Sequence, residues 1–169
     1  HSAVNQCNSF LMTTTRGSDM PIRDYCNMNV ICCDADTGIA LVAGLMRRHH
    51  VGDVIVIEIN SDGLRIPIGI VTDRDILVES IALDIDAKLF TAGDMMTAPL
   101  VTVREDASLF DAIKLMRNRK IRRLPVLAHA GNLFGIITSD DIINLLASEL
   151  SLMAAAMVEQ PGREESLRK

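Results

Sequence analysis

Two stretches of the sequence carry a threonine and an aspartate at the same spacing, each directly after an apolar run. Residues 69–76 read Gly-Ile-Val-Thr-Asp-Arg-Asp-Ile, and residues 135–142 read Gly-Ile-Ile-Thr-Ser-Asp-Asp-Ile. The two pairs are Thr72 with Asp75 and Thr138 with Asp141. A threonine followed three residues later by an aspartate is typical of a helix start, where the hydroxyl caps the first turn. Each stretch therefore predicts the end of a buried strand that runs into a capped helix.

The same arrangement suits a ligand that carries phosphate and ribose. A helix N-terminus presents free N–H groups and the positive end of the helix dipole, both of which attract phosphate. A nearby carboxylate can accept hydrogen bonds from the two ribose hydroxyls. A capping box that only satisfies backbone N–H groups explains the pattern equally well. The residues alone leave both interpretations open.

Glycines and arginines beside these pairs extend the candidate site. Gly69 and Gly135 open the two stretches, and we expect them to let a ligand approach the backbone, because glycine has no side chain in the way. Ile136 follows Gly135 and joins the candidate contacts. Arg122 and Arg123 carry forked guanidinium groups that suit phosphate oxygens, although adjacent basic residues at a strand start are often only solvated surface.

The bulk composition narrows the function classes. The chain has 169 residues, of which 49% are hydrophobic, 23% charged and 3% aromatic, as expected for a globular protein with an aliphatic core. A net charge of −5 disfavours nucleic-acid and anionic-membrane partners, and the scarcity of aromatic residues disfavours a platform for single-stranded nucleic acid. We expect a cytoplasmic protein with reduced cysteines. His49 and His50 lack further ligands at zinc spacing, so we predict no metal site.

The two stretches belong to a longer internal repeat. Gly69 and Gly135 lie 66 residues apart, and the apolar periodicity around each predicts the element order β-α-β-β-α. We assign a leader to residues 1–20, the first repeat to 21–90, the second to 91–158 and a flexible tail to 159–169. We expect the fold class α/β (α+β), with a last helix that begins after Thr138 and ends at about Val158.

In this order and number, the motifs resemble a tandem pair of CBS domains, the cystathionine β-synthase domains that together form a Bateman module. The resemblance runs from about Pro21 to Met153. Besides the two Gly-x-x-Thr-x-x-Asp stretches, it includes residues 121–126, Ile-Arg-Arg-Leu-Pro-Val, and residues 95–97, Met-Met-Thr. It implies two repeats packed with pseudo-two-fold symmetry and a homodimer.

The resemblance also implies a function. Thr138, Asp141 and their counterparts would bind the ribose and phosphate of an adenine nucleotide, and the two arginines would reach the phosphates in the cleft between repeats. AMP is the leading candidate, followed by ADP, ATP or S-adenosylmethionine, as a regulatory ligand rather than an obligatory cofactor. The first repeat departs from the pattern, because Gly52 and Asp53 stand where the second repeat has Arg122 and Arg123. We therefore expect two unequal clefts.

Three functional hypotheses follow. The first is a regulatory module that passes nucleotide binding to an effector protein or to its own assembly state. The second is a structural, dimer-forming module whose threonine–aspartate pairs are only caps. The third, an enzyme, is disfavoured because the sequence has no Gly-x-x-x-x-Gly-Lys loop, no Gly-x-Gly-x-x-Gly fingerprint and no Gly-x-Ser-x-Gly elbow.

Overall fold

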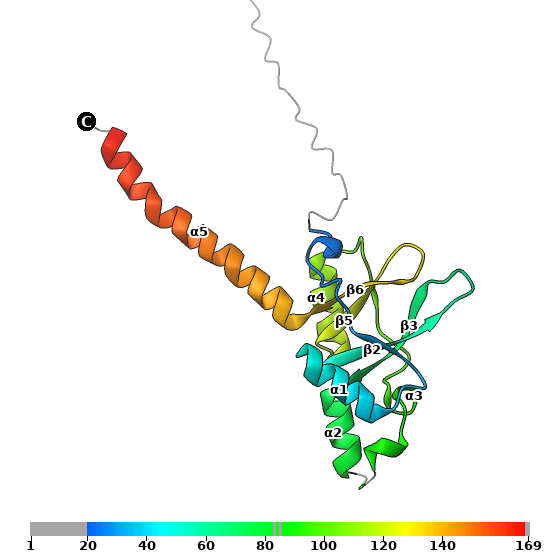
Figure 1. Ribbon diagram of the computed structural model, residues 1–169. Helices are drawn as coiled ribbons and strands as arrows, with labels where there is room; N and C mark the ends of the chain where they lie inside the picture. Colours follow the sequence, from blue (N-terminus) through cyan, green and yellow to red (C-terminus); the bar gives the residue numbers. More distant parts are fainter. Residues whose placement is uncertain (1–19, 83, 85, 168–169) are drawn as a thin grey trace, which may run out of the picture.

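The structure is a computed structural model that describes residues 20–82, 84 and 86–167, with side chains as far as residue 157 (Figure 1). All but the last residue of the predicted leader lies outside the described residues. None of the helices in the described part is both long and apolar enough to cross a membrane.

The predicted β-α-β-β-α order is confirmed twice. The first repeat consists of β1 Cys32–Asp34, α1 Ile39–His49, β2 Asp53–Ile59, β3 Arg65–Thr72 and α2 Asp73–Ala82. The second consists of β4 Val103–Arg104, α4 Leu109–Arg119, β5 Arg123–Leu127, β6 Leu133–Thr138 and α5 Ser139–Leu167. Short helices η1 Ile22–Asp24, η2 Ala87–Leu89 and α3 Ala92–Met95 lie in the connections. Helix α5 extends well beyond the predicted end near Val158 and projects from the rest of the molecule in Figure 1.

Each repeat has a three-stranded sheet with the same topology. In the first, β2 pairs with β1 in parallel and with β3 antiparallel, and β5 pairs in the same way with β4 and β6. The hairpins share an irregularity, because the register shifts directly after Val56 and after Val126. These residues stand opposite Gly69 and Gly135. The two glycines therefore occupy equivalent places at a bulge in the two sheets.

Aliphatic side chains of the described residues form three packed clusters. One lies in the first repeat around Val42, Val54 and Val71, and a second lies in the second repeat around Leu109, Leu124 and Ile137. A third cluster joins the two sheets, with Ile55 and Ile57 of β2 against Leu133 and Ile136 of β6. The sheets therefore meet face to face at a buried apolar interface, and the space at its edge is shaped by both repeats.

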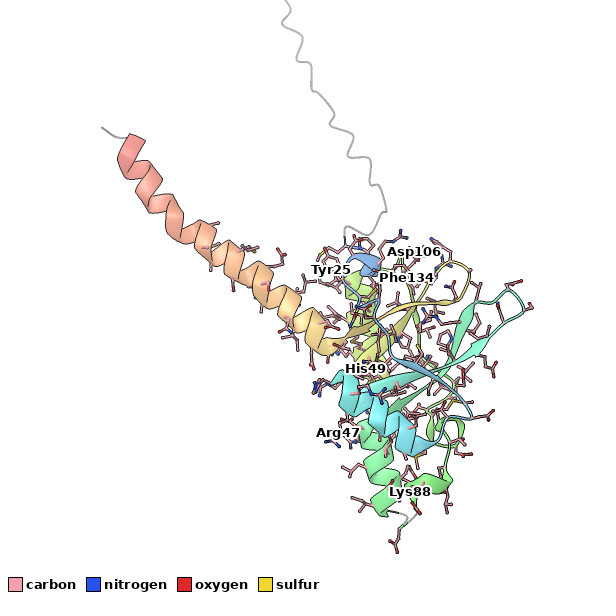
Figure 2. All side chains as sticks on the ribbon, viewed as in Figure 1. Tyr25, Arg47, His49, Lys88, Asp106 and Phe134 are labelled. Atoms are coloured by element: carbon pink, nitrogen blue, oxygen red, sulfur yellow. The ribbon has the colours of Figure 1, made fainter. Side chains whose placement is uncertain are left out.

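The chain segment that leads into each repeat packs on the other repeat. We call residues 20–29 the first arm and residues 91–99 the second arm. Ile22 of the first arm is fully buried in the core of the second repeat. Tyr25 packs against that core, as does Phe134 of β6, and both side chains are labelled in Figure 2.

The second arm makes the reciprocal contact. Ala92 and Met95 are buried in the core of the first repeat. The arms also add short bridges to the opposite sheets, Asn27 with Ile136 and Thr97 with Ile70. The boundaries at residues 21 and 91 thus mark where the sequence repeats. The packed units differ from the sequence repeats, because each arm lies in the core of the other repeat.

Candidate functional site

Both predicted threonine–aspartate pairs form reciprocal capping boxes. In each, the aspartate Oδ2 accepts hydrogen bonds from the threonine backbone N–H at 2.9 Å and from the threonine hydroxyl at 2.7 Å, while the aspartate N–H donates to the hydroxyl at 3.2 Å. The prediction of two capped helix starts is confirmed for α2 and α5. Among the described residues, the second oxygen of Asp141, Oδ1, accepts no hydrogen bond.

The box by itself does not identify a binding site. Thr91 and Asp94 form the same box at the start of α3, and Ser108 with Asp111 forms a closely similar one at the start of α4. Hydrogen bonds from Thr91 hold the pKa of Asp94 below its usual value, and the Ser108 hydroxyl does the same for Asp111. Because the described part of the chain uses this device at four helix starts, function depends on what surrounds each box.

The surroundings single out the box of α5. A cleft of about 300 Å³ lies between the repeats and is bordered by Thr138 and Asp141 at the start of α5. The first arm and the segment after it supply one wall, with the apolar side chains of Val30 and Ile31. Ile136, a predicted contact, also borders it. Polar groups at a helix start thus face apolar side chains in a cavity of a size that small-molecule sites have.

Arg122 and Arg123 both border this cleft, and both already have carboxylate partners. Arg122 Nη2 lies 3.0 Å from Asp140 Oδ1, and its Nε donates to the Ser139 hydroxyl at 3.3 Å. The side chains of Arg122 and Asp140 are 73% and 69% exposed. Such an exposed ion pair contributes little, so Arg122 can turn to another anion at small cost.

Arg123 is held more firmly. Its guanidinium forms an ion pair with Asp53 of β2, and the two side chains are only 33% and 14% exposed. Asp53 is the residue that takes the place of Arg123 in the first repeat, so the pair joins equivalent positions of the two repeats. Burial raises the pKa of the Asp53 carboxyl, and this is the largest effect on it. The Arg123 guanidinium lowers the same pKa, whereas the nearby carboxylates of Asp73 and Asp141 raise it further.

Gly52 makes room for this ion pair. A Cβ atom built on Gly52 would lie 2.9 Å from Nη2 of Arg123 and 3.4 Å from a carboxylate oxygen of Asp73. The guanidinium therefore lies directly against the Gly52 backbone. Gly52 and Asp53 are the positions at which the sequence of the first repeat departs from that of the second. The sequence did not predict that Asp53 would neutralise the charge of Arg123.

Gly69 and Gly135 have a protein neighbour in the place where the sequence predicted a ligand. The space beside both glycines is filled by the arms of the chain and not by a cavity. Met96 of the second arm contacts the position of a Gly69 side chain, and the carbonyl oxygen of Asn27 lies 2.9 Å from the corresponding position at Gly135. The glycines are required because an arm passes so close to the strand, and neither borders the cleft described above.

The pair in the first repeat has different surroundings. Asp75 borders a separate hollow that it shares with Glu79, Phe90 and residues 94–97 of the second arm. Thr72 does not border the α5 cleft. The surroundings of the two pairs therefore differ, and the structure brings Thr138 and Asp141, but not Thr72 and Asp75, together with the arginines. The sequence did not predict Asn27, Val30 and Ile31 as lining residues, because they precede β1 and carry no motif.

The described residues offer no cluster of three or more histidine, cysteine or acidic side chains that could hold a metal ion. His49 is exposed at the end of α1, on the same helix as Arg47 (Figure 2). Cys26, Cys32 and Cys33 are free thiols, and burial raises the pKa of each. Thiols of this kind are poor nucleophiles and poor metal ligands near neutral pH.

The sequence pattern of the CBS domain matches residues 22–81 and 92–148, which together make up most of the chain. The chain belongs to the CBS-domain family. An uncharacterized protein of Methanopyrus kandleri is 34% identical over 126 residues, which span 75% of this chain but 61% of that protein. The whole relative is thus longer than the part shared with this chain.

Two further proteins are similar to this chain. Hypoxic response protein 1 of Mycobacterium tuberculosis is 32% identical over 120 residues, covering 71% of this chain and 80% of that protein. Its crystal structure, which contains two coordinated zinc ions, has a TM-score of 0.62 over 74% of this chain and 98% of the other, at 29% identity. The CBS domain pair of protein MJ0100, in complex with 5-methylthioadenosine and S-adenosyl-L-methionine, has a TM-score of 0.66 at 22% identity and covers 77% and 98% of the two chains.

Proposed function

We propose that this CBS-domain pair is a non-catalytic regulatory module that binds an adenine nucleotide, in the first place AMP, in the cleft at the start of α5. The proposal is carried by one observation, the convergence of Asp141, Arg122 and an apolar wall on a single cavity between the repeats. The apolar residues Val30, Ile31 and Ile136 suit a purine ring. The unbonded Oδ1 of Asp141 suits the ribose hydroxyls.

The phosphate would lie between the start of α5 and Arg122. The helix end offers the positive end of its dipole, and Arg122 is bound only to the exposed Asp140. Arg123 is a weaker candidate than the sequence predicted, because a phosphate must compete with Asp53 for its guanidinium. One readily available arginine in a cleft that also contains Asp53, Asp140 and Asp141 favours a monophosphate over the more highly charged ADP and ATP.

Such a ligand would contact both repeats at once. Val30, Ile31 and Asp53 belong to the first repeat and its arm, whereas Arg122 and Asp141 belong to the second. A ligand that binds one relative placement of the repeats more tightly than another shifts the balance between them. Regulation of an effector protein, or of a homodimer of this chain, would follow from that shift.

A related structure supports an adenosine-containing ligand, although its low identity demonstrates only a common fold. The CBS domain pair of protein MJ0100 was crystallised with 5-methylthioadenosine and S-adenosyl-L-methionine, neither of which carries phosphate. These compounds share adenosine with AMP, so the apolar wall and Asp141 would serve them equally. They therefore belong in any test of ligand choice.

The second candidate function is a structural module that assembles without a ligand. The four similar capping boxes favour this structural function. The boxes of α3 and α4 do not border the cleft, so the described part of the chain also uses the box where no ligand site is proposed. Exposed apolar residues on α2, Leu77, Val78 and Ile81, also favour it, since such surfaces mark contacts with other proteins. In that case Asp141 acts only as a cap.

Isothermal titration calorimetry of the pure protein with AMP, ADP, ATP, S-adenosylmethionine and 5-methylthioadenosine distinguishes the two functions. We expect saturable binding of AMP at one site per chain. Asp141→Ala should abolish it, whereas Asp75→Ala, which removes the equivalent cap of α2, should leave it intact. The absence of heat with all five compounds at millimolar concentration would refute nucleotide binding and leave the structural module.

A further inference from the structure

Arginine, lysine and histidine side chains gather at the carboxyl ends of helices α1 and α4. We call them the basic rim, and they are Arg47, Arg48, His49 and His50 at the end of α1 and Arg117, Arg119 and Lys120 at the end of α4. All of them are exposed, and none forms an ion pair with another described residue. Figure 2 labels Arg47 and His49 on α1.

The fold brings the two helix ends to the same edge of the molecule. The segments 51–53 and 122–123, which follow the two helices closely, border the same cleft. Asp53 and Arg123, within these segments, form the ion pair that joins the repeats. The cations of α1 and α4 therefore lie on one surface beside the cleft, although their helices belong to different repeats.

The helix ends themselves explain only part of this charge. The negative end of a helix dipole attracts a cation, but the effect is limited to the last turn and one or two cations satisfy it. Further cations on neighbouring positions repel one another. The rim therefore carries more positive charge than its own two helices stabilise, and a partner with negative charge would relieve the repulsion.

The backbone at the two helix ends also points to the side chains. His50 and Lys120, which lie 70 residues apart at equivalent places in the repeats, have φ angles of 53° and 57°. This left-handed conformation costs free energy for every residue with a side chain, and glycine usually occupies the position. Both repeats nevertheless have a residue that can carry positive charge there, which indicates a function for the side chain.

We propose that the basic rim binds an acidic segment of a partner protein, with aspartate or glutamate side chains spaced along an extended chain. The whole chain has a net charge of −5, so the rim is a local exception and such a segment would be attracted to this surface rather than to the rest of the molecule. Carboxylates on separate residues can meet the separate cations of α1 and α4 at the same time.

A nucleic acid fits the same surface less well. The exposed carboxylates of Asp73 and Asp140 flank the rim, since Asp140 borders the cleft and an oxygen of Asp73 lies 3.4 Å from the position of a Gly52 side chain. A continuous phosphate backbone across the rim would meet these carboxylates and be repelled. The rim also has no aromatic side chain on which a base could stack. Acidic protein is therefore the better partner.

Fluorescence anisotropy with a labelled deca-glutamate peptide at low ionic strength tests the rim. We expect saturable binding that added salt weakens. Arg47→Glu combined with Arg119→Glu reverses one charge on each helix end and should weaken binding at least about tenfold, because glutamates would then face glutamates. The matched control combines Arg65→Glu with Lys88→Glu. It makes the same change in net charge on exposed residues of β3 and η2, and it should bind the peptide like wild type.

Three results would overturn the proposal. The first is wild-type protein that does not bind the peptide. The second is equal weakening by the two double variants, both checked for folding by circular dichroism, because net charge and not the rim would then attract the peptide. The third is a thymidine oligonucleotide of equal charge that binds wild type more tightly than the peptide does, since the rim would then favour nucleic acid. AMP takes no part in these measurements, so their failure would leave the proposed nucleotide site untouched.

Discussion

Replacement of Asp53 by asparagine tests whether the ion pair with Arg123 limits the charge that the cleft accepts. The Asp53 and Arg123 side chains are largely buried and face each other across the two repeats. Asparagine keeps the size of the side chain and removes its charge. The guanidinium of Arg123 then becomes available to a phosphate, and one carboxylate that would repel the phosphate disappears. We expect AMP to bind more tightly to Asp53→Asn than to wild type.

The size of the effect follows from the exposure of Arg123. A hydrogen bond to a charged group contributes about 1.5–3 kcal/mol when it is protected from solvent. The Arg123 side chain is 33% exposed, so solvent screening reduces the gain to about 1 kcal/mol. Since 1.4 kcal/mol corresponds to a factor of ten, the dissociation constant of AMP should fall about fivefold.

Calorimetry with AMP and with adenosine provides the measurement and its control. Adenosine has no phosphate, so Asp53→Asn should leave its affinity unchanged. Asp140→Asn is the matched variant: it releases Arg122 from an exposed ion pair, and we expect a gain of about twofold at most. The reasoning is refuted if Asp53→Asn, folded and as heat-stable as wild type, binds AMP no more tightly, or if adenosine gains as much as AMP.

Three further predictions concern stability. Asp141→Ala and Asp75→Ala should each lower the free energy of unfolding by about 1 kcal/mol in urea titrations, because each removes a helix cap; a much larger loss in one of them would indicate an additional structural role. Ile22→Ala should lower the free energy of unfolding by about 2–5 kcal/mol, because this residue of the first arm is fully buried in the second repeat. A loss below about 0.5 kcal/mol, typical of a surface residue, would contradict the exchange of arms. The pKa of Asp53 is raised, so the native state holds this proton to a higher pH than the unfolded state does. The free energy of unfolding of wild type, compared with that of Asp53→Asn, should therefore fall as the pH rises from the ordinary carboxyl pKa to the raised pKa. Thermal unfolding across the acidic range measures this difference, and a constant difference would refute it.

Most of the fold could be predicted from the sequence because its signals are local. The alternation of apolar runs, the turn residues and the threonine–aspartate boxes determine where strands and helices begin, and all of these act within a few residues. The end of α5 was predicted too early. From residue 147 to residue 157 every side chain of the helix is exposed, so burial against the body gave no sign of where the helix ends.

The candidate site was predictable only in part. Thr138, Asp141 and the arginines stand out by residue type and spacing, and the structure brings them to one cleft. The apolar wall of Val30 and Ile31 carries no such signal, because an isoleucine or valine before a strand is equally typical of any core. The glycines were assigned to a ligand because a sequence does not reveal which neighbour occupies the space beside them.

The sequence by itself determined that the protein has two similar units, where their elements lie, and that the second unit carries the arginines that the first lacks. Only the tertiary structure decided that the arms exchange between the units and that Asp53 neutralises Arg123. The physical reason is the same in both cases. Residues 53 and 123, like residue 22 and the core around Leu109, are far apart along the chain, and their contact depends on how two folded units pack, which no local pattern encodes.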